Sequence, residues 1–205
     1  RAVSRCVNAQ RIKRVSKGRF YTPKPGVLGP MSVSDSELLR DVLFRRGKRR
    51  AYITGPALYN RLGLTTQIPK TVMVATNGAA QTKDFGTIRI KYTPRRAPIS
   101  ESTVPLLELL DVLRDAKKVP GAKADNVVEF VTRRIGALNP SELKKLQKIA
   151  VEYYSASTRA LLGMILERIG EAVLLDLRRS INPTTRFELS LNLTEWPEAG
   201  AWNIR

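Results

Sequence analysis

The sequence predicts an α+β protein, in which a partial winged helix-turn-helix precedes a mixed domain of a small antiparallel sheet and about five helices. Three observations predict it. Residues 1–21 have the pattern of a short helix followed by a basic hairpin, residues 72–92 contain two strand-like runs, and apolar residues recur at helical spacing beyond residue 103. We place the C-terminal half of a winged-helix domain at residues 1–30 and an α+β effector domain at residues 31–205.

The first element is a predicted recognition helix. Its apolar residues recur at spacings of three and four, which favours a helix with one apolar stripe: Ala2, Val3, Cys6 and Val7. The other side of this helix carries Arg1, Ser4, Arg5 and Asn8. Arginine and asparagine can make bidentate contacts to guanine and adenine, and serine can contact a base or a phosphate. We therefore predict that these four residues contact DNA.

A basic hairpin is predicted next. Two apolar and basic runs, residues 11–15 and 19–21, flank a glycine-containing turn, which is typical of a hairpin. The side chains predicted to hold phosphates or the adjacent minor groove are Lys13, Arg14, Lys17 and Arg19. The alternative is a solvated hairpin that caps the core. A complete winged helix has two more helices before the recognition helix, so we expect further residues upstream of Arg1.

The charge distribution agrees with this assignment. Residues 1–50 carry fourteen Lys/Arg and three acidic residues, and residues 1–24 carry eight Lys/Arg and no acid. A basic footprint at one end predicts contact with a polyanion, although composition alone would equally fit RNA or an anionic membrane surface. No apolar run approaches the ~18 residues of a membrane span. The single cysteine, Cys6, fits a reducing cytoplasm and is predicted to be a small core residue.

Residues 34–98 are predicted to form two helices and a pair of strands. Ser34-Asp-Ser-Glu37 has the spacing of a capping box, which predicts a helix start. This helix ends in the basic cluster 45–50, which is either a second phosphate contact or a solvated terminus that favours the helix dipole. A short helix follows between Pro56 and Gly63. Residues 72–75 and 86–92 are predicted to pair, with 82–84 in the intervening loop and 94–98 in an exposed bend.

Beyond residue 103 the sequence is predicted to be mainly helical. Apolar residues recur at helical spacing in five stretches: Leu106–Leu113, Val127–Ile135, Leu143–Tyr153, Leu161–Ile169 and Val173–Leu177. Asp125 is predicted to cap the second of these helices, and Asn139-Pro-Ser-Glu142 to cap the third. Residues 187–194 alternate apolar and polar side chains, which predicts a half-buried strand.

The composition excludes several kinds of catalysis. The chain has no histidine, which removes Ser-His-Asp and Cys-His catalysis and histidine-ligated metals, and one cysteine cannot build a zinc site. The sequence contains no phosphate-binding loop and no dinucleotide-type glycine pattern. We therefore predict a protein without catalytic residues, cofactor or metal.

One carboxylate pattern keeps an enzymatic alternative open. Glu108, Asp111 and Asp115 lie three and four residues apart, so they share a helix face that could hold Mg²⁺ in a nuclease or transferase. The alternative is the polar face of an amphipathic helix, because two-metal sites draw ligands from several elements. Four tyrosines could stack on bases, but their positions favour the borders between helices and core: Tyr52, Tyr59, Tyr153 and Tyr154.

The chain resembles the AbiEi-type transcriptional regulators, the antitoxins of type IV toxin–antitoxin systems, including relatives of unassigned function. The segment most typical of them is Tyr52-Ile-Thr-Gly-Pro-Ala-Leu-Tyr-Asn-Arg-Leu-Gly-Leu-Thr-Thr-Gln-Ile-Pro69. Further similar stretches are Ala2-Val-Ser-Arg5, residues 12–21, Leu107–Leu113 around Asp111, Thr158–Gly163 and Ile181–Pro183. The resemblance covers nearly the whole chain, and no single motif is diagnostic.

The resemblance implies a cytoplasmic, nucleoid-associated bacterial regulator that is not an enzyme. In that family the winged helix binds operator DNA and represses a two-gene operon, and the C-terminal domain counteracts a nucleotidyltransferase-like toxin without a stable complex. The expected partners are duplex operator or promoter DNA, such a toxin and a second copy in a homodimer, with no membrane. Two alternatives stay open: an RNA-binding protein whose basic wing grips an A-form backbone, and a carboxylate–metal nuclease or transferase.

Overall fold

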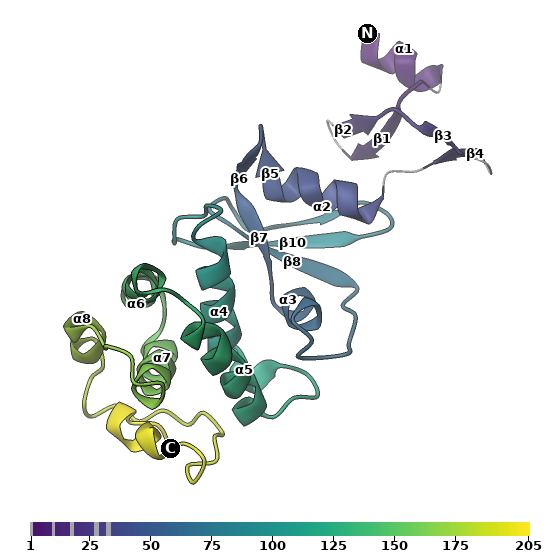
Figure 1. The fold of residues 1–205 in the computed structure, drawn as a ribbon. Coiled ribbons are helices and arrows are strands. Elements are labelled where there is room, and N and C mark those ends of the chain that lie inside the picture. The colour runs from purple at the N-terminus through teal and green to yellow at the C-terminus, as the bar shows by residue number, and fades with distance from the viewer. Residues whose placement is uncertain (1, 10, 17–18, 27–28, 32–33) are drawn as a thin grey trace.

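The computed structural model has an α+β fold and describes residues 2–9, 11–16, 19–26, 29–31 and 34–205. Figure 1 shows three parts in succession: a small N-terminal unit at one end, a sheet in the middle, and a layer of helices at the other end. The chain passes through these parts in sequence order, so the basic N-terminal residues lie farthest from the helical layer.

The N-terminal unit contains one helix and two small strand pairs. Helix α1 spans Ala2–Asn8, and its Cys6 carbonyl accepts the backbone N–H groups of Arg11 and Ile12 at 3.0 and 3.3 Å. Strands β1 (Lys13–Ser16) and β2 (Arg19–Tyr21) pair antiparallel, as the hairpin pattern predicts. A second antiparallel pair, β3 (Lys24–Gly26) and β4 (Gly29–Met31), follows in the Pro/Gly-rich segment.

Helix α2 (Asp35–Leu43) begins at the predicted capping box. The Ser34 hydroxyl accepts the Glu37 N–H at 3.2 Å, and the Glu37 carboxylate accepts the Ser34 N–H at 3.3 Å. The helix ends before the basic cluster, which forms a second hairpin of β5 (Phe44–Arg45) and β6 (Lys48–Arg49). Its two turn residues, Arg46 and Gly47, have φ values of 50° and 74°, as expected for a tight two-residue hairpin turn.

The central sheet has four strands in the order β7-β8-β10-β9. Its members are β7 (Ala51–Thr54), β8 (Thr71–Thr76), β9 (Gln81–Asp84) and β10 (Arg89–Pro94). The sheet is mixed, which corrects the prediction of a purely antiparallel one, because β8 and β10 run parallel. The reason is the segment predicted to be a loop: it forms β9 at the outer edge, and β10 then returns antiparallel to β9 into the space beside β8.

Each face of the sheet packs against its own core. Alternate residues of β7 and β8 point to opposite faces, since the side-chain period of a strand is two. Leu38 and Val42 of α2 pack on one face with Ala51 and Val74. Tyr52 and Ala75 belong to the larger core on the other face, together with α3 (Pro56–Arg61) and the helical layer.

The helical layer follows the predicted periodicity closely. Its α-helices are α4 (Val104–Arg114), α5 (Ala124–Gly136), α6 (Pro140–Tyr153), α7 (Ala156–Arg168) and the short α8 (Leu175–Arg179). Two 3-10 helices, η1 (Ala116–Lys118) and η2 (Pro197–Trp202), complete it. The predicted capping box of α6 is confirmed, because Asn139 accepts the Glu142 N–H at 3.0 Å and its own N–H donates to Glu142 at 3.1 Å.

Two predictions in this region are wrong. Lys123, not Asp125, precedes the first residue of α5, and the Asp125 carboxylate instead accepts the Asn192 N–H at 2.8 Å and the Trp196 indole N–H at 3.0 Å. Residues 187–194 form no strand, and only Phe187 makes an isolated bridge, to Ile204. A left-handed residue, Ser190 with φ 57°, interrupts the extended backbone that the alternation requires.

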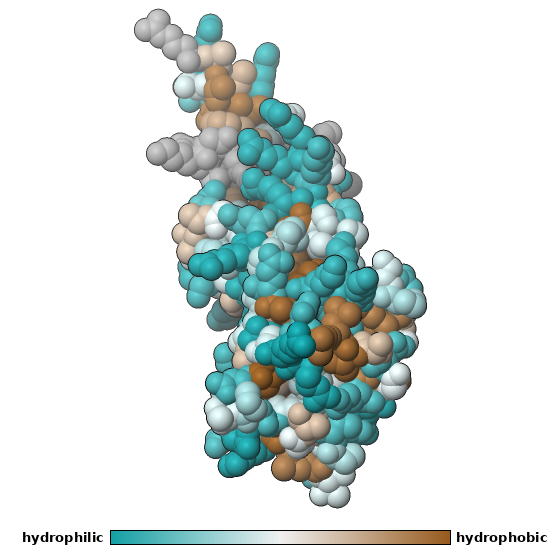
Figure 2. Space-filling model, turned by 90° about the vertical axis from the view of Figure 1, so that its left-hand side faces the viewer, coloured by the Kyte–Doolittle hydropathy of each residue, from teal (hydrophilic) through white to brown (hydrophobic). Residues whose placement is uncertain are grey.

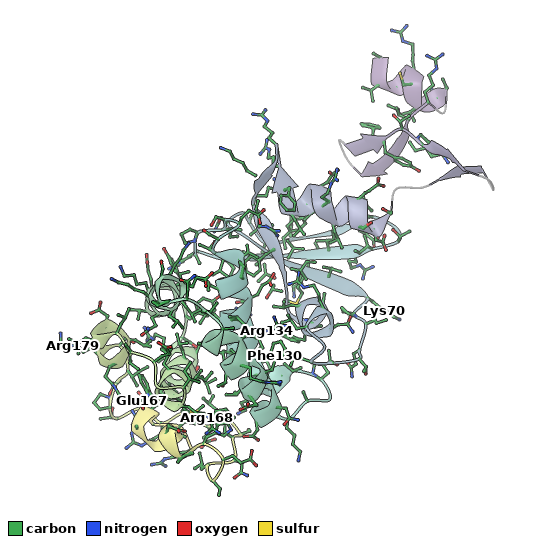
Figure 3. The ribbon with its side chains drawn as sticks, in the orientation of Figure 1. Lys70, Phe130, Arg134, Glu167, Arg168 and Arg179 are labelled. Atoms are coloured by element: carbon green, nitrogen blue, oxygen red, sulfur yellow. The ribbon has the colours of Figure 1, made fainter. Side chains whose placement is uncertain are left out.

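The C-terminal segment instead folds against α7. The Trp202 ring lies where a side chain at Gly163 would be, and its indole N–H donates to Glu167 at 2.8 Å. Arg168 stacks on the Trp196 ring, with its guanidinium carbon 4.4 Å from the ring centroid. Glu167 and Arg168 reach from α7 toward this segment (Figure 3). An indole-filled notch at a helix glycine therefore holds the C-terminus in place.

Candidate nucleic-acid interface

The predicted base-reading residues lie on the exposed surface of α1. Ser4, Arg5 and Asn8 are all exposed, and they share one side of the helix because Asn8 lies four residues after Ser4 and three after Arg5. Lys13, at the start of β1, is exposed as well. Arg14 and Arg19 lie on β1 and β2, and Arg1 and Lys17 lie outside the described residues.

The apolar stripe of α1 is not buried, contrary to the prediction for Cys6. No described residue of α1 is buried: Val3 is 48% exposed and Cys6 is half-buried. Phe20 of the neighbouring hairpin is 40% exposed. Figure 2 shows apolar atoms at the surface of this unit, near the top of the view. Within the described residues, α1 therefore has no neighbouring element that covers its apolar stripe.

The basic cluster after α2 is a β-hairpin, not the terminus of a helix. Its root is anchored by three contacts. The Arg49 guanidinium stacks 4.5 Å from the centroid of the Phe44 ring, and its Nε lies 3.0 Å from a Glu101 carboxylate oxygen. Arg50 donates from Nε to the Val42 carbonyl at 3.2 Å. These contacts fix the hairpin to α2 and to the segment before α4.

The tip of this hairpin presents the remaining cations to solvent. Arg45, Arg46 and Lys48 are exposed, and none of their side chains forms an ion pair or hydrogen bond with another described residue. Figure 1 shows the hairpin projecting from the sheet toward the end of the molecule that carries the N-terminal unit. Three unpaired cations on an anchored, tight turn form a surface suited to phosphate groups, which bind arginine and lysine by charge-assisted hydrogen bonds.

The predicted carboxylate row has a different role, centred on the fully buried Asp111. Its Oδ2 accepts hydroxyl hydrogen bonds from Tyr52 and Thr54 of β7 at 3.0 and 2.5 Å. Its Oδ1 accepts from Tyr154, at the α6–α7 junction, at 3.0 Å and from Arg114 at 2.6 Å. These four hydrogen bonds fill the acceptor capacity of a carboxylate. Asp111 therefore joins the sheet, α4 and the α6–α7 junction.

The other two carboxylates of the row are also paired. Asp115 accepts from the Tyr59 hydroxyl at 2.8 Å and from Arg114 at 2.7 Å, and Glu108 lies 2.7 Å from Arg61. No group of three or more metal-ligating side chains is assembled within the described residues. The row lies on one helix face, as the spacing predicts, but arginine and tyrosine partners occupy it.

Burial and charge shift the titration of this network. Burial, reinforced by the negative charge of Asp111, raises the pKa of Tyr52 and Tyr154, and burial beside Asp115 raises the pKa of Tyr59. Burial alone would raise the pKa of Asp115, but its hydrogen bond and charge pairing with Arg114 lower it. The three tyrosines thus act as neutral hydrogen-bond donors inside the protein. This confirms the assignment of Tyr52, Tyr59 and Tyr154 to the borders between helices and core.

Comparison with known families matches residues 1–139 to a family of unknown function, DUF6088. The chain belongs to the DUF6088 family. No curated protein and no solved structure matches the chain. The DUF6088 match covers the N-terminal unit, the basic hairpin β5–β6, the sheet and Asp111, and it ends between α5 and α6. Both basic hairpins and the central carboxylate therefore lie within the part of the chain that defines the family.

Sequence reasoning missed how distant segments of the DUF6088 protein meet. Arg95 and Arg96, predicted to lie in an exposed bend, share a pocket with Arg114 and Tyr154. The adjacent Arg95-Arg96 pair, in a bend without acidic residues, was the available signal in the sequence. Along the described chain, no helix has the length and apolar character needed to cross a lipid bilayer.

Proposed function

We propose that this DUF6088 protein is a DNA-binding transcriptional regulator. The observation that supports it best is the anchored basic hairpin β5–β6, whose exposed Arg45, Arg46 and Lys48 have no anionic partner among the described residues. It projects toward the end of the molecule that carries α1 (Figure 1), whose polar residues are exposed. In this proposal the two basic surfaces contact one duplex, because both carry exposed cations and both lie toward the same end of the molecule.

The two surfaces have different tasks. On α1, Arg5 and Asn8 read base edges in the major groove, where arginine and asparagine match guanine and adenine. The hairpins β1–β2 and β5–β6 contact phosphates, which position the protein without reading the sequence. In this arrangement α1 is the recognition helix and β1–β2 the wing of a winged helix.

The resemblance to AbiEi-type regulators extends the proposal to an antitoxin. The protein would repress its own operon through operator DNA, and residues beyond the N-terminal unit would counteract a nucleotidyltransferase-like toxin encoded beside it. The buried Asp111 network supports this second task indirectly, because it ties the sheet to the helices and so gives any partner a rigid surface.

The test is a fluorescence-anisotropy titration against three labelled probes at several salt concentrations. The probes are the DNA immediately upstream of the gene, a random DNA duplex and an RNA duplex. We expect tight binding that is selective for the upstream DNA and weakens steeply with salt, because counterions are released from neutralised phosphates. Equal binding to all three probes, or a preference for the RNA duplex, would contradict the proposal.

Two variants separate base reading from phosphate contact. Arg5→Ala should cost about 1–3 kcal/mol on the upstream DNA and much less on random duplex. The triple variant Arg45→Ala/Arg46→Ala/Lys48→Ala should weaken all duplexes and reduce the salt slope by about 3. The matched control is Arg133→Ala/Lys144→Ala/Lys148→Ala, which removes three exposed cations from α5 and α6. If the control lowers the salt slope as much, net charge and not the hairpin explains the binding.

A further inference from the structure

A pocket of about 200 Å³ lies where the end of β10, the end of α4 and the α6–α7 junction meet. The residues that line it are Arg95, Arg96, Ala97, Arg114, Tyr153, Tyr154 and Ser155. Three of these seven side chains are guanidinium groups, and none is an acid. The pocket belongs to the body of the protein and is separate from the two basic surfaces assigned above to DNA.

Arg95 is incompletely paired in this pocket. Its one carboxylate neighbour is Asp111, whose Oδ1 lies 3.8 Å from the Arg95 Nε, too far for a hydrogen bond. Asp111 already accepts four hydrogen bonds, so it has no acceptor capacity left for Arg95. The Nε of Arg95 is buried without any hydrogen-bond partner. A buried donor without an acceptor is costly, and an anion in the pocket would supply one.

The rest of the lining adds to the positive potential. Arg96 is exposed and makes no hydrogen bond or ion pair with a described residue. Ser155 is the N-cap of the thirteen-residue helix α7, and helix N-termini attract anions through their free N–H groups and dipole. The half-buried ring of Tyr153 provides a flat surface on which a nucleobase can stack.

We propose that this pocket binds a phosphate monoester, carried by a mononucleotide or by the 5′ end of a nucleic-acid strand. Guanidinium forks match phosphate oxygens in bidentate geometry, and a terminal phosphate presents three such oxygens. A pocket of about 200 Å³ holds the phosphate group itself and leaves the nucleoside outside, against Tyr153. Arg95 and Arg96 bind the phosphate directly, while Arg114 stays bonded to Asp111 and Asp115.

The experiment is isothermal titration calorimetry on the full chain with two matched pairs of probes. One pair is AMP and adenosine, and the other is a 5′-phosphorylated and a 5′-hydroxyl tetranucleotide. We expect the phosphorylated member of at least one pair to bind at least about tenfold more tightly, the contribution typical of one charge-assisted hydrogen bond. Preference for AMP identifies a free nucleotide, and preference for the phosphorylated strand alone identifies a strand end.

Arg96→Ala should abolish the difference within each pair, because its exposed side chain lines the pocket and makes no hydrogen bond or ion pair with a described residue. The matched control is Arg133→Ala, an exposed arginine of α5, which should change affinity less than about twofold. The hairpin variant Arg45→Ala/Arg46→Ala/Lys48→Ala should retain phosphate preference even if DNA binding fails. Equal affinity within both pairs, or equal loss in Arg96→Ala and Arg133→Ala, would overturn the proposal.

Discussion

The N-terminal unit, up to residue 31, and the body of this protein, residues 34–205, differ in how far their side chains are buried. Helix α1 has no buried residue among those described, and its strand pairs are three or four residues long. The body has a core on each face of its sheet and a buried, fully hydrogen-bonded carboxylate between sheet and helices. Exposed cations dominate the first region, and apolar contacts dominate the second.

This difference indicates which region stabilises the fold and which region has side chains available for a ligand. A helix with no buried residue, such as α1, contributes little to the free energy of unfolding, because burial of apolar surface is the main stabilising term. Its side chains are therefore available for a ligand. The hairpin β5–β6 combines both properties, since Arg49 and Arg50 are tied to the body while the cations at its tip stay exposed.

The strongest test of the body is Asp111→Asn. The substitution keeps the shape but removes one of the two carboxylates that pair with Arg114, and its amide nitrogen replaces an oxygen that accepts two hydrogen bonds. Breaking a buried pair in this way costs about 3–5 kcal/mol, which we expect to see in urea denaturation followed by circular dichroism. Glu129→Gln, on the exposed face of α5, is the control and should stay within about 0.5 kcal/mol. An unchanged midpoint for Asp111→Asn would mean that the network does not hold sheet and helices together.

Alkaline pH is expected to lower the free energy of unfolding of the body. The pKa values of Tyr52, Tyr59 and Tyr154 are raised above the ordinary value of 10, so the folded protein keeps these hydroxyls protonated. Their stabilising effect is complete below pH 10 and is lost as pH rises further, because the unfolded chain ionises first. Above pH 10, each of these tyrosines lowers the free energy of unfolding by about 1.4 kcal/mol per pH unit.

Tyrosinate absorbance during a pH titration measures this effect. These three tyrosines should ionise only as the protein unfolds, and circular dichroism should lose its helical signal in the same pH range. Tyr154→Phe should reduce the number of delayed ionisations by one. Reversible ionisation of all six tyrosines near pH 10, with the fold intact, would show that the hydroxyls are accessible.

Gly163→Ala tests the notch that holds the C-terminal segment. An added Cβ would overlap the Trp202 ring, so the ring must move. Over-packing of this kind costs about 1–3 kcal/mol, measurable as a lower thermal midpoint. Gly136→Ala, in α5, meets no atom within 4 Å and should stabilise by up to about 1 kcal/mol through helix propensity. If both variants shift the midpoint equally, the notch contributes nothing specific.

The smallest effect is expected in the N-terminal unit. Val3→Ala removes an exposed side chain of α1 and should change unfolding by less than about 0.5 kcal/mol. Val42→Ala, from the core beneath α2, should cost about 1–3 kcal/mol. Comparable losses in the two variants would show that α1 is buried in solution, by a second copy or by another part of the protein.

Local signals in the sequence predicted most helices well. The capping boxes at Ser34 and Asn139 need only residues three apart, so they can be recognised without tertiary structure. The failed predictions depend on distant partners. Asp125 accepts the Trp196 indole N–H instead of capping α5. Residues 187–194 bond to Asn203 and Arg205 at the C-terminus and to Asp125 of α5 instead of to another strand.

The candidate sites were predictable to different degrees. The cationic N-terminus and the cluster 45–50 are visible as charge along the chain, although hairpin geometry is needed to show that one cluster has an anchored root and a free tip. The arginine pocket could not be predicted, because its members come from positions 95, 114 and 155 and meet only after the sheet and helices have packed. Periodicity describes an element, but it does not say which elements become neighbours.

The position of the two tryptophans gives the protein an internal optical reporter. Trp196 and Trp202 are both buried in the C-terminal segment, and each lies against an arginine, Arg168 or Arg178. Intrinsic tryptophan fluorescence therefore reports on the docking of this segment against α7, and a ligand bound at the opposite end of the molecule should leave it unchanged. One unlabelled sample can thus distinguish release of the C-terminus from events at the N-terminal unit.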